Sequence, residues 1–118
     1  MAIKLVEQQF LEYVEEEFLP GGYVGYAVPS RDCKNLCVIK FKTGKFFWEG
    51  EYPYDEIMYV IDGPVKMRTE GKTYVAQSGD ILFVNKGTTA SYEAEISSNV
   101  FSVTFNPPLD VLVRKIER

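Results

Sequence analysis

The sequence contains no histidine among its 118 residues. Histidine is the usual general base near neutral pH and the commonest side-chain ligand of transition metals. Any catalysis by this chain is therefore expected to rely on carboxylates, tyrosine, lysine or cysteine.

Cysteine and long hydrophobic runs are scarce as well. Cys33 and Cys37 are the only cysteines, and without histidine they cannot complete a tetrahedral zinc site. Two reduced thiols are typical of a reducing compartment, and a disulfide between them is the alternative. No run approaches the roughly 20 apolar residues of a membrane span, and the first residues lack the apolar core of a signal peptide. We expect a cytoplasmic protein without a membrane partner.

Basic residues are outnumbered by acidic ones. The chain has 13 Lys and Arg against 17 Asp and Glu, a net charge of -4. Phosphate contacts need a basic face, so this balance argues against nucleic-acid binding. A hydrophobic content of 46% and a charged content of 25% are those of an ordinary soluble protein. The length predicts one domain over residues 1–118.

Short segments with β-type patterns fill most of the chain. Turn residues separate them at intervals of roughly eight to twelve residues, which is typical of a sandwich or barrel. Two of these segments are expected to form a hairpin that turns at Glu70-Gly71, where glycine can take a positive φ. The residues 110–118 fit either a strand or a short helix. Strands are expected over residues 23–28, 35–42, 57–61, 65–76 (the hairpin), 81–84, 90–96 and 99–105.

Residues 5–18 have a helical pattern. Five apolar side chains fall on one stripe, and Leu19-Pro20-Gly21-Gly22 then ends the segment. We expect a helix lying across the barrel, with an extended start as an alternative. A membrane-surface helix is disfavoured because the polar face carries glutamates rather than lysine or arginine. The stripe consists of Val6, Phe10, Tyr13, Val14 and Phe18.

The order of motifs between residues 46 and 87 resembles the cupin family. Glu56 and Gly63 have the spacing of the first cupin motif, and Gly79 and Gly87 match the second. The resemblance implies an all-β, single-domain barrel (a double-stranded β-helix of jelly-roll type) over about residues 22–107. The helical pattern adds a short N-terminal helix over about residues 4–18. The histidine positions of metal-binding cupins fall on Glu49, Glu51 and Ala90.

A closer resemblance is to the ethanolamine-utilisation (EutQ-type) cupins, which also lack these histidines. It covers residues 45–107 at most. It implies a role in ethanolamine or acetaldehyde metabolism beside a bacterial microcompartment, an acetate-kinase activity, and a homodimer. Lys86-Gly87-Thr88-Thr89 lacks the glycine frame of a Walker loop. The matching segments are Phe46-Phe47, Tyr54-Asp55-Glu56-Ile57, Glu70-Gly71-Lys72-Thr73, Ser78-Gly79-Asp80 and Lys86-Gly87.

Three glutamates are candidates for the chemistry. Glu49 and Glu51 alternate on one strand and project to the same face, about 7 Å apart, and Glu56 stands just before the next strand. If all three lie inside the barrel, like charges raise their pKa values. A hard divalent cation (Mg²⁺, Mn²⁺ or Ca²⁺), a basic partner, or a shared proton would relieve the repulsion. Alternatively, Glu49 and Glu51 lie in solvent. If Glu51 is buried beside Glu56, Glu51→Gln should raise thermal stability.

Several other side chains complete the predicted site. Glu56, Glu51 and Tyr54 are the catalytic candidates. Tyrosine hydroxyls donate hydrogen bonds in pockets, although tyrosine on strands is often simply core. Asp55 and Glu56 could equally cap a turn and pair with lysine or arginine, and packing at the barrel entrance is the alternative for Trp48. The ligand-binding candidates are Tyr92, Tyr52, Trp48, Asp55 and Lys86.

Three functions remain open from the sequence. The first is a EutQ-like cupin that binds or acts on a small polar metabolite, with or without a weakly held divalent cation. The second is a non-catalytic ligand-binding or dimerisation cupin. The third is a carboxylate-metal isomerase or lyase.

Overall fold

The computed structural model describes residues 3–29 and 36–105. Within these residues the elements are η1 (Gln8–Phe10), a short 3-10 helix, and the strands β1 (Tyr13–Glu15), β2 (Gly22–Val28), β3 (Leu36–Thr43), β4 (Phe46–Glu51), β5 (Asp55–Asp62), β6 (Val65–Thr69), β7 (Lys72–Ala76), β8 (Ile81–Val84), β9 (Thr89–Ala94) and β10 (Ser98–Phe105). The tail at 110–118 and Cys33 lie outside the described residues.

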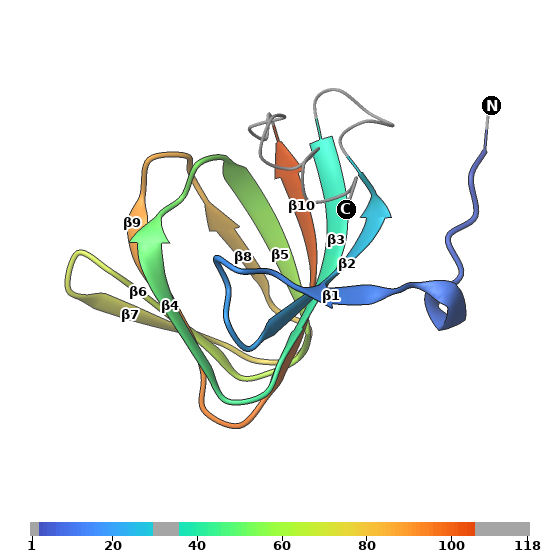
Figure 1. The fold of residues 1–118 in the computed structure, drawn as a ribbon. Coiled ribbons are helices and arrows are strands. Elements are labelled where there is room, and N and C mark those ends of the chain that lie inside the picture. Colours follow the sequence, from blue (N-terminus) through green and yellow to red (C-terminus); the bar gives the residue numbers. More distant parts are fainter. Residues whose placement is uncertain (1–2, 30–35, 106–118) are drawn as a thin grey trace.

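Two antiparallel sheets form the walls of the molecule (Figure 1). The larger sheet has the order β1-β2-β3-β10-β5-β8, and the smaller sheet has the order β4-β9-β6-β7. Strands far apart in sequence are neighbours, because β10 lies between β3 and β5 and β9 lies between β4 and β6. The predicted all-β architecture is confirmed.

The predicted strands are present. Most of their ends are shifted by one or two residues, and the other ends agree with the prediction. The hairpin β6–β7 turns at Glu70 and Gly71, whose φ values of 49° and 77° are both left-handed. Such a turn matches the twist of the two strands. Along β6, Val65 and Met67 are buried whereas Arg68 is exposed, so the side chains of this strand alternate between the core and solvent.

The predicted N-terminal helix over residues 4–18 is wrong. The segment contains only η1 and β1, and β1 pairs with β2 at the edge of the larger sheet. A lone helix of this length is marginal in water, whereas the β2 edge supplies backbone hydrogen-bond partners and Tyr13 and Val14 favour strands. The stripe is not buried as a helix would require, since Phe10 is 73% exposed and Phe18 is 44% exposed. No helix among the described residues is long and apolar enough to cross a membrane.

The interior between the sheets holds the core, and β10 turns its hydroxyl-bearing face toward it. Ser102 is fully buried and Thr104 nearly so, whereas Phe101 on the other face is 39% exposed. Strand alternation therefore does not decide by itself which face is inside. The buried cluster includes Val24, Phe41, Phe46, Tyr52, Met58, Val60, Val65, Met67, Ala76, Val84, Ala90, Tyr92, Ala94 and Val100.

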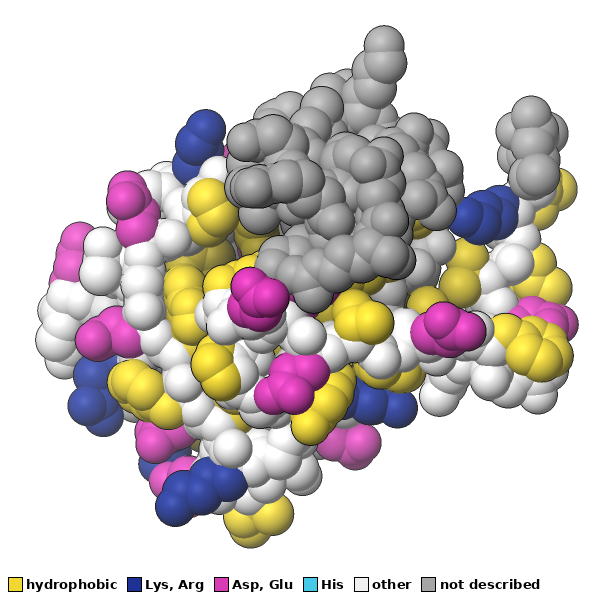
Figure 2. All heavy atoms as spheres, in the orientation of Figure 1, with side chains coloured by type: hydrophobic (Ala, Val, Ile, Leu, Met, Phe, Trp, Pro, Cys, Tyr) yellow, Lys and Arg dark blue, Asp and Glu magenta, His cyan; other side chains and the backbone are white. Residues whose placement is uncertain are grey.

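The outer surface is mixed in charge and carries one apolar face. In the view of Figure 2 acidic, basic and hydrophobic side chains are interspersed, without a large patch of one charge. Partners in register across β8, β5 and β10 place Ile81 beside Tyr59, Phe83 beside Ile57, and Tyr59 beside Phe101. We call these side chains, all partly or largely exposed, the outer apolar face: Ile57, Tyr59, Ile81, Phe83 and Phe101.

Candidate functional site

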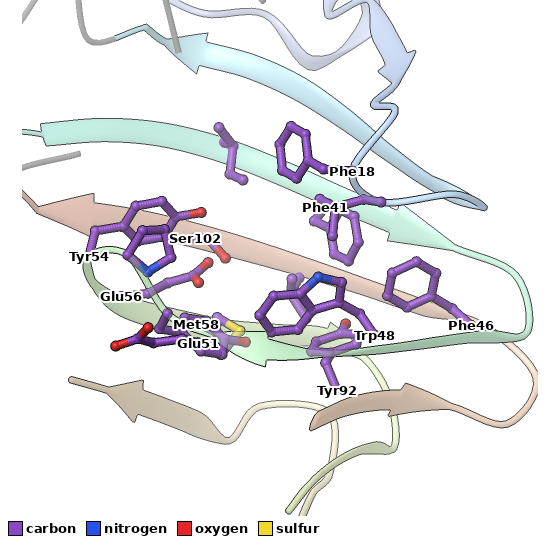
Figure 3. A pocket seen from close by; sticks show the side chains of 15 residues that line it. Phe18, Phe41, Phe46, Trp48, Glu51, Tyr54, Glu56, Met58, Tyr92 and Ser102 are labelled. Carbon is purple, nitrogen blue, oxygen red and sulfur yellow. The ribbon is translucent and has the colours of Figure 1, made fainter. Parts of the chain in front are cut away.

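A cavity of about 260 Å³ lies between the two sheets (Figure 3). Strands β3, β4, β5, β9 and β10 all contribute to its wall, together with the loop after β4 and the residues just before β2. Most of the wall is aromatic or aliphatic. The lining residues are Phe18, Leu19, Ile39, Phe41, Phe46, Trp48, Glu51, Tyr52, Pro53, Tyr54, Glu56, Met58, Tyr92, Val100 and Ser102.

Glu56 is the buried acid of this cavity. It shares the inward face of β5 with Met58 and Val60, because side chains alternate along a strand. Its side chain points into the same space as Ser102 of the neighbouring β10 (Figure 3). Glu56 is 7% exposed, and no lysine or arginine among the described residues lines the cavity around it. Its charge is therefore uncompensated by the protein within residues 3–29 and 36–105.

Burial raises the pKa of Glu56 from 4.5 to about 7, because a carboxylate loses its hydration inside the barrel. The Ser102 hydroxyl favours the ionised form and opposes this shift in the pKa. Nonetheless Ser102 Oγ has no hydrogen-bond partner of ordinary geometry. Glu56 consequently exchanges a proton near neutral pH, and desolvation rather than the repulsion expected from Glu49 and Glu51 is the main cause.

Three tyrosines surround the acid with neutral hydroxyl groups. Burial, and then the charge of Glu56, raises the pKa of Tyr52 and of Tyr54 far above the usual value. Burial also raises the pKa of Tyr92 to about 12. All three phenols stay protonated at neutral pH, so they can act as hydrogen-bond donors to a guest.

A chain of buried hydroxyls fixes Tyr92. Its hydroxyl lies 2.8 Å from Ser98 Oγ, which lies 2.8 Å from Thr43 Oγ1. The Tyr92 ring also packs edge-on against Phe41 and Phe46, with centroids 5.6 and 5.8 Å away. This end of the cavity is therefore rigid, because both the ring and its polar end are held.

Trp48 and Tyr52 form a second aromatic pair in the wall. Their ring centroids are 5.2 Å apart and their planes are nearly perpendicular. Trp48 projects from β4 toward the cavity (Figure 3), and Tyr52 is 6% exposed. Both residues line the cavity, so they lie where a guest would touch them.

The two acids of β4 are not buried beside Glu56. Glu49 and Glu51 are both exposed, because the inward positions of β4 are Phe46 and Trp48. Glu51 still reaches the cavity wall, and Glu49 does not line it. Glu51→Gln was expected to raise thermal stability only if Glu51 were buried beside Glu56. Because Glu51 is exposed, this stabilisation is not expected.

The three-glutamate cation site, one of the alternatives that the sequence left open, is not assembled in the described residues. Within residues 3–29 and 36–105, no three acidic, cysteine or histidine side chains lie close enough to hold a metal ion. Hard cations prefer six or more oxygen ligands, and Glu56 alone supplies a buried carboxylate here. These side chains do not fit the metal ion that other cupins hold, so no metal takes part in the chemistry proposed for this cavity.

Asp55 and Lys86 are joined to each other outside the cavity. Asp55 Oδ1 accepts a hydrogen bond of 2.7 Å from the backbone N–H of Lys86. This contact ties the start of β5 to the turn after β8, which is the turn-capping role that the sequence left open. Neither residue is among those that line the cavity.

Sequence reasoning missed several lining residues. Ser102 lies on the polar face of β10, which the sequence analysis did not assign to the interior. Phe41, Phe46 and Met58 looked like ordinary core residues, and Phe18 was assigned to a helix. A polar alternation on the last strand of a barrel was the one signal that could have singled out Ser102.

The family comparison identifies the chain on most of its length. The model of the family described as "Ethanolamine utilisation protein EutQ" matches residues 25–109. Acetate kinase EutQ of Salmonella typhimurium is 41% identical over 65 residues, covering 55% of this chain and 28% of that protein. Acetate kinase EutQ of Clostridioides difficile is 31% identical over 68 residues, covering 58% of this chain and 42% of that protein. The chain spans less than half the length of these curated relatives.

Solved structures show the same fold at low sequence identity. A crystal structure of EutQ from Salmonella typhimurium superposes with a TM-score of 0.81 at 21% identity, over 88% of this chain and 86% of that chain. An RmlC-like cupin from Shewanella frigidimarina superposes with a TM-score of 0.73 at 13% identity, over 89% and 92%. The predicted cupin fold is confirmed. Together with the match over residues 25–109, this shows that the chain belongs to the EutQ family of ethanolamine utilisation proteins.

Proposed function

We propose that this chain is a EutQ-type cupin domain whose cavity binds a small metabolite of ethanolamine utilisation, with Glu56 as proton donor and acceptor. One observation carries the proposal: a buried carboxyl whose pKa is raised to about 7 faces a cavity of about 260 Å³. A general acid or base is most effective when its pKa lies near the working pH.

The neighbouring groups suit this role. Tyr54 and Tyr52 supply neutral donors close to Glu56, and Tyr92 supplies another from the fixed end of the cavity. Glu51 stands in the wall without being buried, so it can meet a polar end of the guest. Pockets that combine an apolar wall with a few convergent polar groups are typical small-molecule sites.

Phosphoryl transfer, the activity in the names of the curated relatives, receives less support from this cavity. A transferred phosphoryl group needs cations around its oxygens, and no lysine or arginine is among the described residues that line the cavity. We therefore place nucleotides among the compounds to be tested. A cytoplasmic location beside a bacterial microcompartment is part of the proposal, since it follows from the family's role.

Titration calorimetry with candidate compounds tests the proposed function. We expect acetate, acetaldehyde, ethanolamine or a related metabolite to bind the wild-type chain, and Glu56→Gln to weaken binding at least tenfold, about 1.4 kcal/mol. Each compound is also tested with Mg²⁺, Mn²⁺ or Ca²⁺ and with a chelator.

Glu49→Gln is the matched control, because Glu49 is an exposed acid outside the cavity. It should bind like the wild type. Failure of every metabolite and nucleotide to bind, or binding that Glu56→Gln leaves unchanged, would contradict the proposal.

A second candidate function is a dimerisation scaffold, and the outer apolar face favours it. Contiguous apolar patches of this kind often mark protein interfaces. The face extends over β10 and β5 to β8, which is an edge strand of its sheet. A second copy packed by two-fold symmetry would cover the same side chains on both subunits.

Light scattering at micromolar protein concentration tests the dimer. We expect a dimer for the wild type and a monomer for Phe83→Glu, because a buried charge in the centre of an apolar interface is costly. Ile96→Glu is the control, since Ile96 is 84% exposed and lies in the β9–β10 turn away from the face. A wild-type monomer, or a Phe83→Glu dimer, would rule out this interface.

A further inference from the structure

We infer that the guest of the Glu56 cavity is a cationic amine, namely an ammonium group carried on a small apolar skeleton. This inference rests on the proposed function, because it assumes that the cavity is a binding site. It adds the charge and the shape of the ligand, which the fold does not specify.

The charges in the cavity wall have one sign. Glu56 lies deep in the cavity and Glu51 stands in its wall, whereas lysine and arginine are missing from the described lining residues. An anionic guest would meet this carboxylate in a medium of low dielectric, where like charges repel strongly. An ammonium group would instead supply the partner that Glu56 lacks among the described residues.

Aromatic rings surround the same space. Trp48, Tyr52, Tyr54 and Tyr92 all line the cavity together with the acid. Figure 3 shows Trp48, Tyr54 and Tyr92 in the wall. The π face of an aromatic ring attracts a cation, and tryptophan does so best. The remaining wall is aliphatic, from Ile39, Met58 and Val100, and it suits an apolar skeleton behind the ammonium.

The hydrogen-bonding groups also match an ammonium. Such a group has three donors and no acceptor, so its site must offer acceptors. Ser102 Oγ is fully buried and has no partner of ordinary geometry, and it points into the space that Glu56 occupies (Figure 3). Buried polar atoms in proteins are normally satisfied. A donor brought by the guest, between Glu56 and Ser102, would satisfy this one.

Proton release accompanies binding if the guest is a cation. The groups that face Glu56 are the neutral phenols of Tyr52, Tyr54 and Tyr92, the Ser102 hydroxyl, and Glu51 in the cavity wall. A bound cation favours the ionised carboxylate and lowers the pKa of Glu56. At pH 7 part of the Glu56 population is protonated in the free protein, and the amine would displace that proton.

Three probes with one skeleton and different charges test the inference. Titration calorimetry compares 2-phenylethylamine (a cation), 2-phenylethanol (neutral) and 3-phenylpropanoate (an anion) at pH 7 in two buffers of different ionisation enthalpy. We expect the amine to bind at least tenfold more tightly than the alcohol, the anion to bind most weakly, and the amine alone to release protons to the buffer.

Two variants locate the effect. Glu56→Gln keeps the shape of the side chain. It should weaken binding of the amine at least tenfold, leave binding of the alcohol unchanged and abolish proton release. Ser102→Ala should weaken binding of the amine several-fold and increase the number of protons released, because the Ser102 hydroxyl lowers the pKa of Glu56. Glu49→Gln should change none of these quantities.

The outcomes separate the inference from the proposed function. Equal binding of the amine and the alcohol, or preferred binding of the anion, would overturn the amine inference and leave the cavity as a binding site. Failure of all three probes and of the metabolites named above would overturn both.

Discussion

Glu56→Gln is expected to be more stable than the wild type by about 3 kcal/mol at pH 8 and equal to it near pH 4. Burial raises the pKa of Glu56 from 4.5 to about 7 in the folded protein. Between these values the folded state binds more protons than the unfolded state, so the free energy of unfolding falls as the pH rises. Each unit of pKa shift corresponds to about 1.4 kcal/mol, and the loss is complete above the folded pKa.

Urea denaturation at a series of pH values measures this difference. Trp48, the only tryptophan, lines the cavity and reports unfolding by fluorescence, and circular dichroism provides a second probe. Glu51→Gln is the control, because Glu51 is exposed, and its stability should follow the wild type at every pH. If the free energies of unfolding of Glu56→Gln and of the wild type differed by the same amount at every pH from 4 to 8, the carboxyl would not be desolvated in the folded state.

The second large effect is expected from Tyr92→Ala. The free energy of unfolding should fall by about 3 to 5 kcal/mol, the range for removing a large aromatic side chain from a core. Tyr92 is 3% exposed, and its loss removes two of the three edge-to-face contacts among Phe41, Phe46 and Tyr92. Because domains of this size are stable by roughly 5–15 kcal/mol, the variant should be partly unfolded at 37 °C.

Tyr92→Phe separates packing from hydrogen bonding at the same position. It keeps the ring and removes the hydroxyl, while Ser98 keeps Thr43 as a partner. Its cost should be about 1 kcal/mol, the net value of one hydrogen bond. The two variants are compared by thermal and urea unfolding. A Tyr92→Phe variant as unstable as Tyr92→Ala would show that the hydroxyl chain, rather than the aromatic cluster, holds this end of the cavity.

The wild type therefore retains an acid at position 56 at a cost in stability above pH 7. A neutral side chain of the same size would pack there without that cost. Groups that violate the local rules of a core are concentrated at functional sites, and natural proteins tolerate such costs when stability exceeds what function needs. This is a reason, independent of the family match, to connect Glu56 with the activity of the cavity.

The fold could be predicted because the sequence pattern of a strand depends on residues that are close together in the chain. Period-two alternation and turn residues mark β8 at residues 81–84 and the hairpin around Gly71, and both depend on neighbours in sequence. The prediction of a helix in the N-terminal segment was wrong because of the tertiary structure. Its apolar residues fit a helical stripe, but the free edge of β2 offered hydrogen bonds to β1, and a short helix without a buried face could not compete.

The site could be predicted only in part. Glu56, Tyr52, Tyr54, Tyr92 and Trp48 were expected in the cavity, and all of them line it. The role of Ser102 was missed. The alternative of a three-glutamate cation site was not found among the described residues. Asp55 accepts a hydrogen bond from the backbone N–H of Lys86, and neither residue lines the cavity.

The sequence by itself determined the strand pattern, the lack of histidine and the presence of acids in and beside two neighbouring strands. These are properties of each residue and its near neighbours. Only the tertiary structure decided which acids share a space, because spacing along a strand sets the face of a side chain but not the direction of that face. The pairing of β4 with β9 and of β5 with β10 left Glu49 outside, Glu51 in the cavity wall and Glu56 buried beside Ser102.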